Sequence, residues 1–471
     1  MRVAVIGAGP AGITAAYELT KKNIQVDVYE SSDKVGGLAK TIDLWNQKVD
    51  LGPHRFFSND NRVNKLWLEV AKSDYEMVDR LTRIYYKRKF FFYPLKALDA
   101  LRKLGIFEAT ACVFSYIKEK VKPTRQDGTF ESWVVGKFGR RLFEIFFKTY
   151  SEKLWGITCK ELDADFAAQR IKKLSLFEAI INSIFGNQGK HKTLVDQFAY
   201  PFLGTGMIYE RMQDFINLNG GRVHCNAPVR RVLTVSGKVV GIEMESGVIQ
   251  SYDHVISSMP ISHLVTRLPE VPAEVKLAAH SLKFRNTILV FLNVHGKDLF
   301  EDNWLYIHSS DLKMGRLTNF RNWVPQLYGD NESSIMTLEY WSFEHEDLWK
   351  ASDEELISLA KDELDKTGLI KNSKISEGYV HRINRCYPVY ETGYKNKLKP
   401  VEDYLKSIGG LSVIGRYGSF KYNNQDHSIL MGMLAAENIY SNSNFNLWNI
   451  NTDYDDYQES SVITKTGLRV K

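Results

Sequence analysis

The order of hydrophobic and polar residues at the start of the chain predicts a strand, a helix and a second strand. Residues 2–6 (RVAVI) form a short, mostly β-branched apolar run, which is typical of a buried strand. Apolar residues then recur at the spacing of an amphipathic helix, and a second strand is expected at residues 25–29 (QVDVY). Together these segments predict a βαβ unit.

The middle of the chain changes from a helical to an alternating pattern. Between residues 95 and 219 the periodicity is helical, and one predicted helix over residues 207–218 should stop at the Gly220–Gly221 pair. Five residues of an earlier helix fall on one face: Leu142, Ile145, Phe146, Thr149 and Tyr150. Residues 220–260 contain four or five short alternating strands with glycine turns, which indicates a small β-meander.

The last third of the chain predicts a second sheet and a second glycine-rich turn. Strands such as residues 286–296 (NTILVFLNVHG) and 334–341 (SIMTLEYW) indicate a sheet that covers a substrate. A strand over residues 411–414 should end at Gly415, and a helix should begin at about Gln425. The asparagine- and aspartate-rich tail from residue 441 is expected to be loosely ordered.

Composition excludes several classes of protein. With 471 residues, 44% hydrophobic and 25% charged, the chain is an ordinary globular sequence with two or three folding units. The net charge of +6 is a mild excess of basic residues, and we expect it to be spread along the whole chain. A spread charge of this size favours small anionic substrates, whereas nucleic-acid binding needs a clustered basic surface. Neither a signal peptide nor an apolar run of about 18 residues is evident, and a cytoplasmic location is predicted.

The spacing of the four cysteines predicts no metal site. Cys112, Cys159, Cys225 and Cys386 lie far apart, without the CxxC spacing of a metal or redox motif. They are expected to be buried thiols of a reducing compartment.

Gly7, Gly9 and Gly12 form a GxGxxG turn directly after the first predicted strand. Such glycines allow a tight turn and a close approach to a pyrophosphate, whose charge lies at the positive end of the following helix. Glu30, at the end of the second strand, stands about 20 residues further on, where an acid accepts hydrogen bonds from a ribose. The strand, helix and acid together predict a dinucleotide site, for either NAD or FAD.

Two further motifs favour FAD. Gly36–Gly37, followed by Leu38, resembles the second glycine motif of the two-dinucleotide-binding-domain flavoproteins, where it lies along the ribityl and pyrophosphate part of FAD. Residues 409–439 resemble their C-terminal FAD motif, in which a helix directs its N-terminus at the flavin. The resemblance implies FAD held without a covalent bond, by Gly7, Gly9, Pro10, Ala11, Gly12, Glu30, Gly36, Gly37, Leu38, His54, Gly415, Arg416, Asp426, Ser428 and Ile429.

The predicted fold class is α/β, with a Rossmann-type FAD/NAD(P)-binding domain interleaved with helical and antiparallel-sheet substrate domains. The expected segments are 1–85 (FAD-binding), 86–205 (helical lid and substrate domain), 206–265 (β-meander of the FAD domain), 266–405 (substrate sheet), 406–440 (C-terminal FAD motif) and 441–471 (tail).

Several short segments resemble the UDP-galactopyranose mutases and their relatives. The stretch YSEKLWGITCKEL (residues 150–162) is similar to a mutase segment, and GPHRFF places His54 where the mutases have a flavin-facing histidine. KFRNTILVF and GRYGSFKYNNQD are similar to two further segments, matching Arg285 to a phosphate-binding arginine and Tyr422 to a position that contacts phosphate or flavin.

The resemblance implies a mutase-like site. His54, Arg285 and Tyr422 are the implied catalytic residues, and the implied substrate-binding residues are Tyr150, Trp155, Arg170, Arg285 and Tyr422. In such enzymes the N5 of reduced flavin attacks the anomeric carbon of a nucleotide sugar, so that the ring opens and recloses without net redox change. An epimerisation or oxidation of a sugar carbon at the same N5 is a related possibility, and glycan biosynthesis is the implied process.

Departures from the mutase pattern leave a second class open. Phe57 stands where the mutases have a second histidine, and Asn424 occupies an acidic position. GGLAKT and YYKRKFFFYPLKAL are closer to the amine oxidase, protoporphyrinogen oxidase and phytoene desaturase group. The alternative is therefore an FAD-dependent oxidase or desaturase with an apolar cavity.

The basic and aromatic segment of residues 84–122 is interpreted as a helical lid, because its charges do not form one continuous face. Its alternative function is contact with an anionic membrane or a lipid-linked substrate. The other expected partners are a nucleotide sugar or another small anion, an electron donor for the flavin and a second copy in a homodimer, but no nucleic acid.

Overall fold

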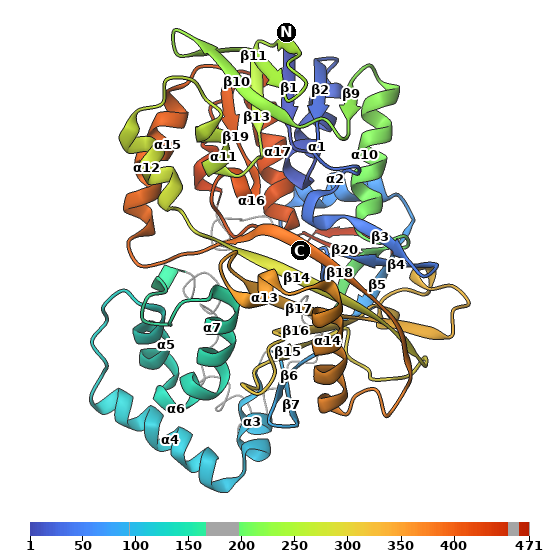
Figure 1. Cartoon of the computed structure of the whole chain (residues 1–471), viewed down its shortest axis with the longest axis vertical. Coiled ribbons are helices and arrows are strands. Elements are labelled where there is room, and N and C mark those ends of the chain that lie inside the picture. The colour runs from blue at the N-terminus through green and yellow to red at the C-terminus, as the bar shows by residue number, and fades with distance from the viewer. Residues whose placement is uncertain (94, 166–196, 451–460, 471) are drawn as a thin grey trace. The chain divides into compact units, whose positions relative to one another are not determined.

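The computed structural model describes residues 1–93, 95–165, 197–450 and 461–470. The chain divides into two compact units (Figure 1): Met1–Val78, Phe198–Lys283 and Tyr394–Lys471 form the first, and Asp79–Gln197 and Phe284–Gly393 form the second. The sequence predicts boundaries after residues 85, 205, 265 and 405. The two units of the structure divide after residues 78, 197, 283 and 393, so each division lies within about 20 residues of the predicted boundary. The predicted helical and substrate-sheet segments share the second unit.

The first unit is built on a parallel sheet of five strands in the order β19-β13-β1-β2-β9. The strands are β1 (Arg2–Ile6), β2 (Gln25–Tyr29), β9 (Arg222–His224), β13 (His254–Ser257) and β19 (Leu411–Val413). The central strand β1 is almost wholly buried, as its apolar run predicts, because helices cover a parallel sheet of this kind. The α/β class and the initial βαβ unit are thus confirmed.

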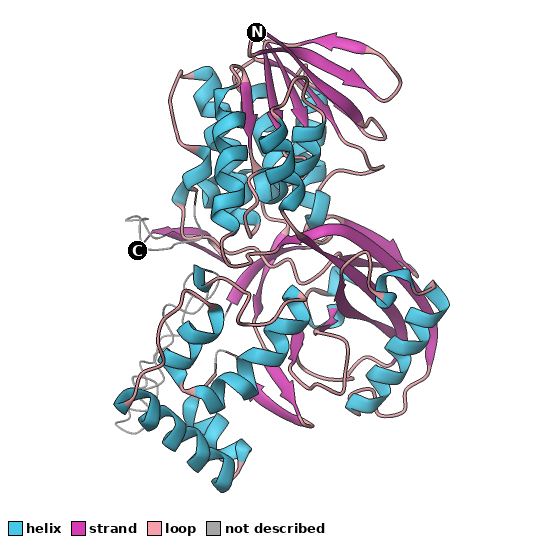
Figure 2. Cartoon of the chain, turned by 60° about the vertical axis from the view of Figure 1, so that its left-hand side comes forward, coloured by secondary structure: helices cyan, strands magenta, loops and turns pink. Residues whose placement is uncertain are grey.

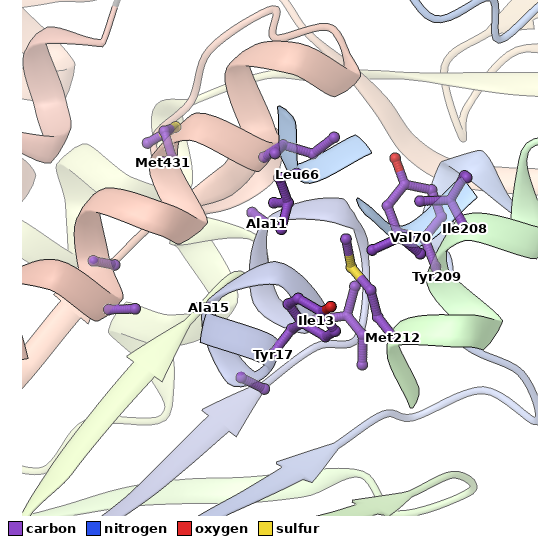
Figure 3. Close-up of a cluster of buried hydrophobic side chains, with 14 of the residues drawn as sticks. Ala11, Ile13, Ala15, Tyr17, Leu66, Val70, Ile208, Tyr209, Met212 and Met431 are labelled. Atoms are coloured by element: carbon purple, nitrogen blue, oxygen red, sulfur yellow. The ribbon is translucent and has the colours of Figure 1, made fainter. Parts of the chain in front are cut away.

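Helix α1 (Pro10–Thr20) lies at the centre of this unit and has nine of its eleven residues buried. It packs against α17 (Gln425–Tyr440) and α10 (Gly206–Leu218), and α2 (Asn61–Ala71) adds to the same core. Figure 3 shows Ala11, Ile13 and Tyr17 of α1 among side chains from these helices. Most residues of α1 face other elements, which explains its many small side chains, since bulky ones would keep the neighbouring helices apart.

Residues 220–260 form five strands, but they do not all belong to one meander. β10 (Val229–Val235), β11 (Lys238–Met244) and β12 (Ile249–Ser251) make an antiparallel sheet, whereas β9 and β13 join the parallel sheet. Alternation identifies strands without identifying their partners, so the sequence could not assign these two.

The tail also departs from the expectation of loose order. Residues 461–470 form a hairpin of β20 (Ser461–Thr464) and β21 (Gly467–Val470). The hairpin is tied to the first unit by hydrogen bonds from the Asn64 amide to Ser461 and from the Tyr75 hydroxyl to the Thr464 carbonyl. The remaining elements of the first unit are η1 (Gly37–Ala39), β3 (Thr41–Leu44), β4 (Gln47–Asp50), β5 (Tyr75–Asp79), β8 (Gln197–Pro201), α11 (Ile261–Thr266), α12 (Ala273–Ser281), α15 (Tyr394–Ser407), α16 (Gly415–Gly418) and η5 (Leu447–Asn449).

The second unit contains a seven-stranded sheet in the order β18-β14-β17-β16-β15-β6-β7. Its strands are β6 (Thr82–Tyr86), β7 (Lys89–Phe92), β14 (Phe284–His295), β15 (Trp304–Ile307), β16 (Arg316–Asn319), β17 (Ser333–Ser342) and β18 (Ile375–Pro388). One face packs on α14 (Asp353–Thr367) through an apolar cluster that includes Ile288, Leu338 and Leu356. Successive side chains along a strand point to opposite faces of the sheet, so the strand neighbours of Ile288 and Leu338 lie on the face opposite α14.

The other helices of the second unit lie beside its sheet, and Figure 2 draws them in cyan like all helices of the chain. They are α3 (Ala97–Leu104), α4 (Ile106–Val121), α5 (Phe130–Phe138), α6 (Arg140–Phe143), a π-helical turn (Glu144–Lys148), α7 (Thr149–Trp155) and α13 (Asp347–Lys350), with short 3₁₀ turns at Phe320–Asn322 and Pro325–Leu327. The π turn lies between Leu142 and Tyr150, so the regular spacing of the predicted helical face is interrupted there. Over the described ranges of the chain, no helix has both the length and the apolarity needed to cross a membrane.

The contact between α1 and α17 should be sensitive to a single added atom. A Cβ on Gly432 would lie 2.4 Å from the Ala11 carbonyl oxygen and 3.0 Å from the Ala15 nitrogen, both backbone atoms. We expect Gly432→Ala to lower the free energy of unfolding by about 1–3 kcal/mol through overpacking, as measured by urea denaturation.

The matched control is Gly136→Ala in α5, where the added Cβ would meet only the end of the Gln126 side chain, at 2.7 Å. That side chain can move, and alanine favours a helix over glycine by about 1 kcal/mol. The control should therefore be neutral or slightly stabilising. Equal losses in both variants would contradict the packing argument.

Candidate functional site

The glycine turn after β1 leaves no room for side chains. Gly7 has a φ of +93°, which L side chains rarely adopt. A Cβ on Gly12 would lie 1.9 Å from the Gly7 carbonyl oxygen, so the first turn of α1 packs directly on the loop before it. The chain can follow this path only with glycine at both positions.

The N-terminus of α1 has the features of an anion site. Its N-cap is Gly9, no side chain caps its first N–H groups, and its first turn contains no acidic residue. Pro10 begins the helix with its φ already suitable, and Ala11 is buried behind it. The first-turn N–H groups and the helix dipole are thus available to a phosphate.

Glu30 and the second glycine pair lie beside this turn. The Glu30 carboxylate accepts hydrogen bonds from the backbone N–H groups of Ala8 (2.8 Å) and Ser32 (2.9 Å), which fixes its position at the end of β2. A Cβ on Gly37 would lie 3.0 Å from the Cα of Gly9, and Gly36 has a φ of +105°. The two glycine loops therefore touch through their backbones, and Leu38 follows in η1.

The C-terminal motif reaches the same helix from the other side. Gly415 has a φ of +79°, and a Cβ there would lie 3.2 Å from the Ala11 Cβ. Ser428 and Ile429 are buried in α17. The N-terminus of α17 is already capped by the Asn424 side chain and holds Asp426 in its first turn, 3.0 Å from the Nδ1 of His427. The expected attraction of this helix end for a reduced flavin is therefore weakened by a nearby carboxylate.

His54, Arg416 and Tyr422 also lie in the first unit. The His54 carbonyl accepts hydrogen bonds from the Thr205 hydroxyl (2.8 Å) and the Gln425 amide (2.9 Å), so the loop of His54 is joined to the first residue of α17. The Arg416 guanidinium lies 4.4 Å from the centre of the Tyr422 ring. The structure thus brings the predicted FAD residues together with two of the three predicted catalytic residues.

Arg285, Tyr150 and Trp155 lie in the second unit. The Arg285 side chain is buried, and its Nη1 and Nη2 donate to the Glu346 carboxylate (2.6 Å) and the Trp341 carbonyl (3.0 Å). Burial lowers the pKa of Arg285, and the Glu346 partner partly offsets this effect. The arginine predicted to bind phosphate is therefore already paired with a carboxylate.

Tyr150 lies in an aromatic cluster on the sheet face opposite α14. Its ring is edge-on to Tyr306 and Trp341, with centroids 5.5 and 5.7 Å away, and stacks on His308 at 4.8 Å. Burial and the charge of Lys153 lower the pKa of His308 to about 3, so this imidazole is neutral at physiological pH. The Trp155 side chain is wholly buried beside the Tyr387 and Tyr390 rings. This environment is that of an aromatic residue in a hydrophobic core.

A second ion pair on the same sheet face was missed in the sequence. Arg316 and Glu339 face each other across β16 and β17, with Nε 2.7 Å from the carboxylate. Burial alone would lower the pKa of Arg316, but the Glu339 carboxylate raises it well above its ordinary value. Neither residue lies in a recognisable motif, and only the strand register brings them together beside Tyr306.

Several polar atoms on this face are buried without a hydrogen-bond partner in the described structure. They are the Thr287, Thr318 and Thr337 hydroxyls, the Trp341 Nε1 and the Arg285 Nε. Buried polar groups in folded proteins are nearly always paired with protein, water or a ligand. We call these residues, with Tyr150, Arg316 and Glu339, the polar sheet face. Arg170, another predicted substrate residue, lies outside the described residues.

The glycine loops, the uncapped helix end and the parallel sheet are those of a dinucleotide-binding protein. The family model "Flavin containing amine oxidoreductase" matches residues 10–439, so the chain belongs to that family. It is an FAD-dependent enzyme, and the residues around the glycine loops suit an FAD pyrophosphate and ribose.

Individual relatives point to different reactions. Coproporphyrinogen III oxidase of Bacillus subtilis is 24% identical over 439 residues, covering 86% of this chain and 91% of that protein. A probable UDP-galactopyranose mutase of Klebsiella pneumoniae is 28% identical over 178 residues, covering 34% of this chain and 43% of that protein. The crystal structure of a reduced UDP-galactopyranose mutase has a TM-score of 0.82 at 21% identity, covering 94% of this chain and 96% of that one, which establishes the shared fold.

We expect Gly12→Ala to purify with little or no FAD, because the added Cβ would force the glycine turn away from α1. The flavin-to-protein absorbance ratio after gel filtration measures this loss. The control is Gly220→Ala in the same unit, where φ is +91° but no atom lies within 4 Å of the added Cβ. If the control loses as much FAD as Gly12→Ala, the loss of FAD results from general backbone strain. Crowding between α1 and the glycine turn would then not be its cause.

Proposed function

We propose that this enzyme acts on a nucleotide-linked sugar, most simply through a ring isomerisation like that of UDP-galactopyranose mutase, or through a related redox or epimerisation step in glycan biosynthesis. The supporting observation is the polar sheet face, where buried hydroxyl, indole and guanidinium donors lack partners among the described residues. A sugar diphosphate is rich in acceptors for such donors, whereas a polyene has none.

In this proposal the chain's own residues bind and orient the substrate. The Arg285 Nε–H and the Thr287 hydroxyl donate to phosphate or sugar oxygens, while Glu346 keeps the Arg285 side chain in place. The Arg316–Glu339 pair presents both a donor and an acceptor to sugar hydroxyls. His54 and Tyr422 are assigned to the flavin side of the reaction. When bound and reduced, FAD supplies a nucleophilic N5 for this chemistry.

The proposal includes partners that the sequence resemblance implies. An external electron donor keeps the flavin reduced, since the isomerisation itself consumes no electrons. A homodimer and a cytoplasmic location remain predictions from the resemblance and the sequence.

The direct test is binding of UDP and dTDP to the dithionite-reduced and the oxidised holoenzyme, followed by flavin absorbance. Affinity that rises on reduction and falls in Arg285→Ala is expected. Glu346 is one-third exposed and can hydrate when its partner is removed, and a thermal melt of the variant checks that the fold persists. Absence of binding in both redox states would refute the sugar proposal.

Thr287→Val tests whether the Thr287 hydroxyl binds the ligand or is only buried in the fold. Valine has nearly the same shape, so removing an unpaired hydroxyl should leave the free energy of unfolding unchanged or raise it by about 1 kcal/mol. Loss of one ligand hydrogen bond should raise the Kd for UDP about five-fold. Thr234→Val, in β10 of the first unit, should change neither the affinity nor the flavin content. Unchanged affinity of Thr287→Val for both UDP and UDP-galactose would remove this residue from the site.

An oxidase remains the second candidate, because the coproporphyrinogen III oxidase relative matches a larger share of the chain than the mutase relative does. An oxidase predicts that the reduced flavin reoxidises rapidly in air and that coproporphyrinogen III reduces it anaerobically. Slow reoxidation with tight nucleotide binding would favour the mutase.

A further inference from the structure

Helix α4 exposes large apolar side chains along most of its length. Phe107, Phe114, Ile106 and Val121 have 91%, 68%, 77% and 81% of their surface exposed, and Ile117 has 49%. Single exposed apolar residues are common on proteins, but a continuous row on one helix marks an interaction surface. Figure 1 shows α4 at the edge of the helical group, next to α3.

The row has the layout of a helix that lies in a membrane interface. At about 100° per residue, Ile106, Phe114 and Val121 share the outer side of α4 with Phe107 and Ile117. Lys118 and Lys120 are exposed and flank this row on opposite sides. The inward side carries Cys112 and the acidic residues Glu108 and Glu119, which bond to Arg141 and Thr124.

The basic charge of the chain is concentrated around this helix and is not spread evenly as the composition suggested. Residues 87–125 contain ten lysines and arginines and three carboxylates, so they carry seven net positive charges, while the whole chain carries six. All three carboxylates are engaged: Asp99 pairs with Lys103 at 2.7 Å, and the other two bond as described above. The exposed charged residues in this range are all basic: Lys87, Arg88, Lys89, Lys96, Arg102, Lys118, Lys120, Lys122 and Arg125.

We propose that α4 and its basic surroundings dock the enzyme on an anionic membrane surface, with the apolar row in the headgroup region and the lysines on lipid phosphates. Phenylalanine and isoleucine provide the buried area, and the flanking lysines keep their ammonium groups at the headgroups.

A second copy of the chain is a poorer occupant, because pairing two such faces would bring two strongly positive surfaces together. Docking would be an additional role for the segment that the sequence analysis interprets as a helical lid. The proposal does not depend on the substrate of the enzyme.

The test is co-flotation of the full-length holoenzyme with vesicles of phosphatidylcholine alone and vesicles in which about a third of the lipid is phosphatidylglycerol. Binding is expected only to the anionic vesicles and should weaken with salt. Phe107→Ser/Phe114→Ser should lower the partition coefficient about ten-fold or more, because two aromatic anchors are lost. Lys118→Gln/Lys120→Gln should weaken binding to the phosphatidylglycerol vesicles about ten-fold and leave a smaller preference, since seven other exposed basic residues remain.

The matched control is Lys276→Gln/Leu277→Ser in α12 of the first unit, where Leu277 is 74% exposed and Lys276 is also exposed. It should float with anionic vesicles as the unmodified enzyme does. Flavin content and thermal midpoint verify that each variant is folded. The proposal is overturned if the enzyme does not bind anionic vesicles, or if Phe107→Ser/Phe114→Ser only converts a dimer into a monomer, since the face would then join two copies.

Discussion

The close approach of α1 to its neighbours is the constraint on which the first unit depends. At one end of the helix, the Gly12 position would place a Cβ 1.9 Å from the Gly7 carbonyl, and along its side the Gly432 position would place one 2.4 Å from the Ala11 carbonyl. These contacts between backbones bring α17 against α1 and leave the first-turn N–H groups of α1 uncapped. The same lack of side chains therefore packs the core and opens the phosphate site.

The parts of the molecule that the sequence predicts well are those in which local pattern and function coincide. β1, α10 and the start of α17 lie where the sequence signals place them, because Gly7 ends β1, Gly220 follows α10 and Asn424 precedes α17. β2 lies where its run of apolar residues predicts a strand. The predicted FAD site includes backbone groups next to these glycines, which is why local signals suffice to propose it. The family match supports the cofactor independently.

The second unit was less predictable because its site is assembled by strand register. Arg316 and Glu339 are 23 positions apart and belong to no motif, yet they form a buried pair because β16 and β17 align them. Glu346 is likewise an ordinary acid in the sequence, and only the folded chain places it on Arg285. The placement of β9 and β13 in the parallel sheet was unpredictable for the same reason, because an alternating run of residues does not specify the sheet that it joins.

Those carboxylate partners change what the two arginines can do. An unpaired buried arginine would attract any anion strongly, but would also cost much free energy to bury in the absence of one. Paired with Glu346 and Glu339, the arginines are held in place, and Arg285 retains its Nε–H for a ligand. Discrimination then depends on the number and geometry of acceptors and not on net charge. Under the proposed function, a sugar phosphate would offer these donors more acceptors than a simple anion does, because its hydroxyl oxygens add to those of the phosphate.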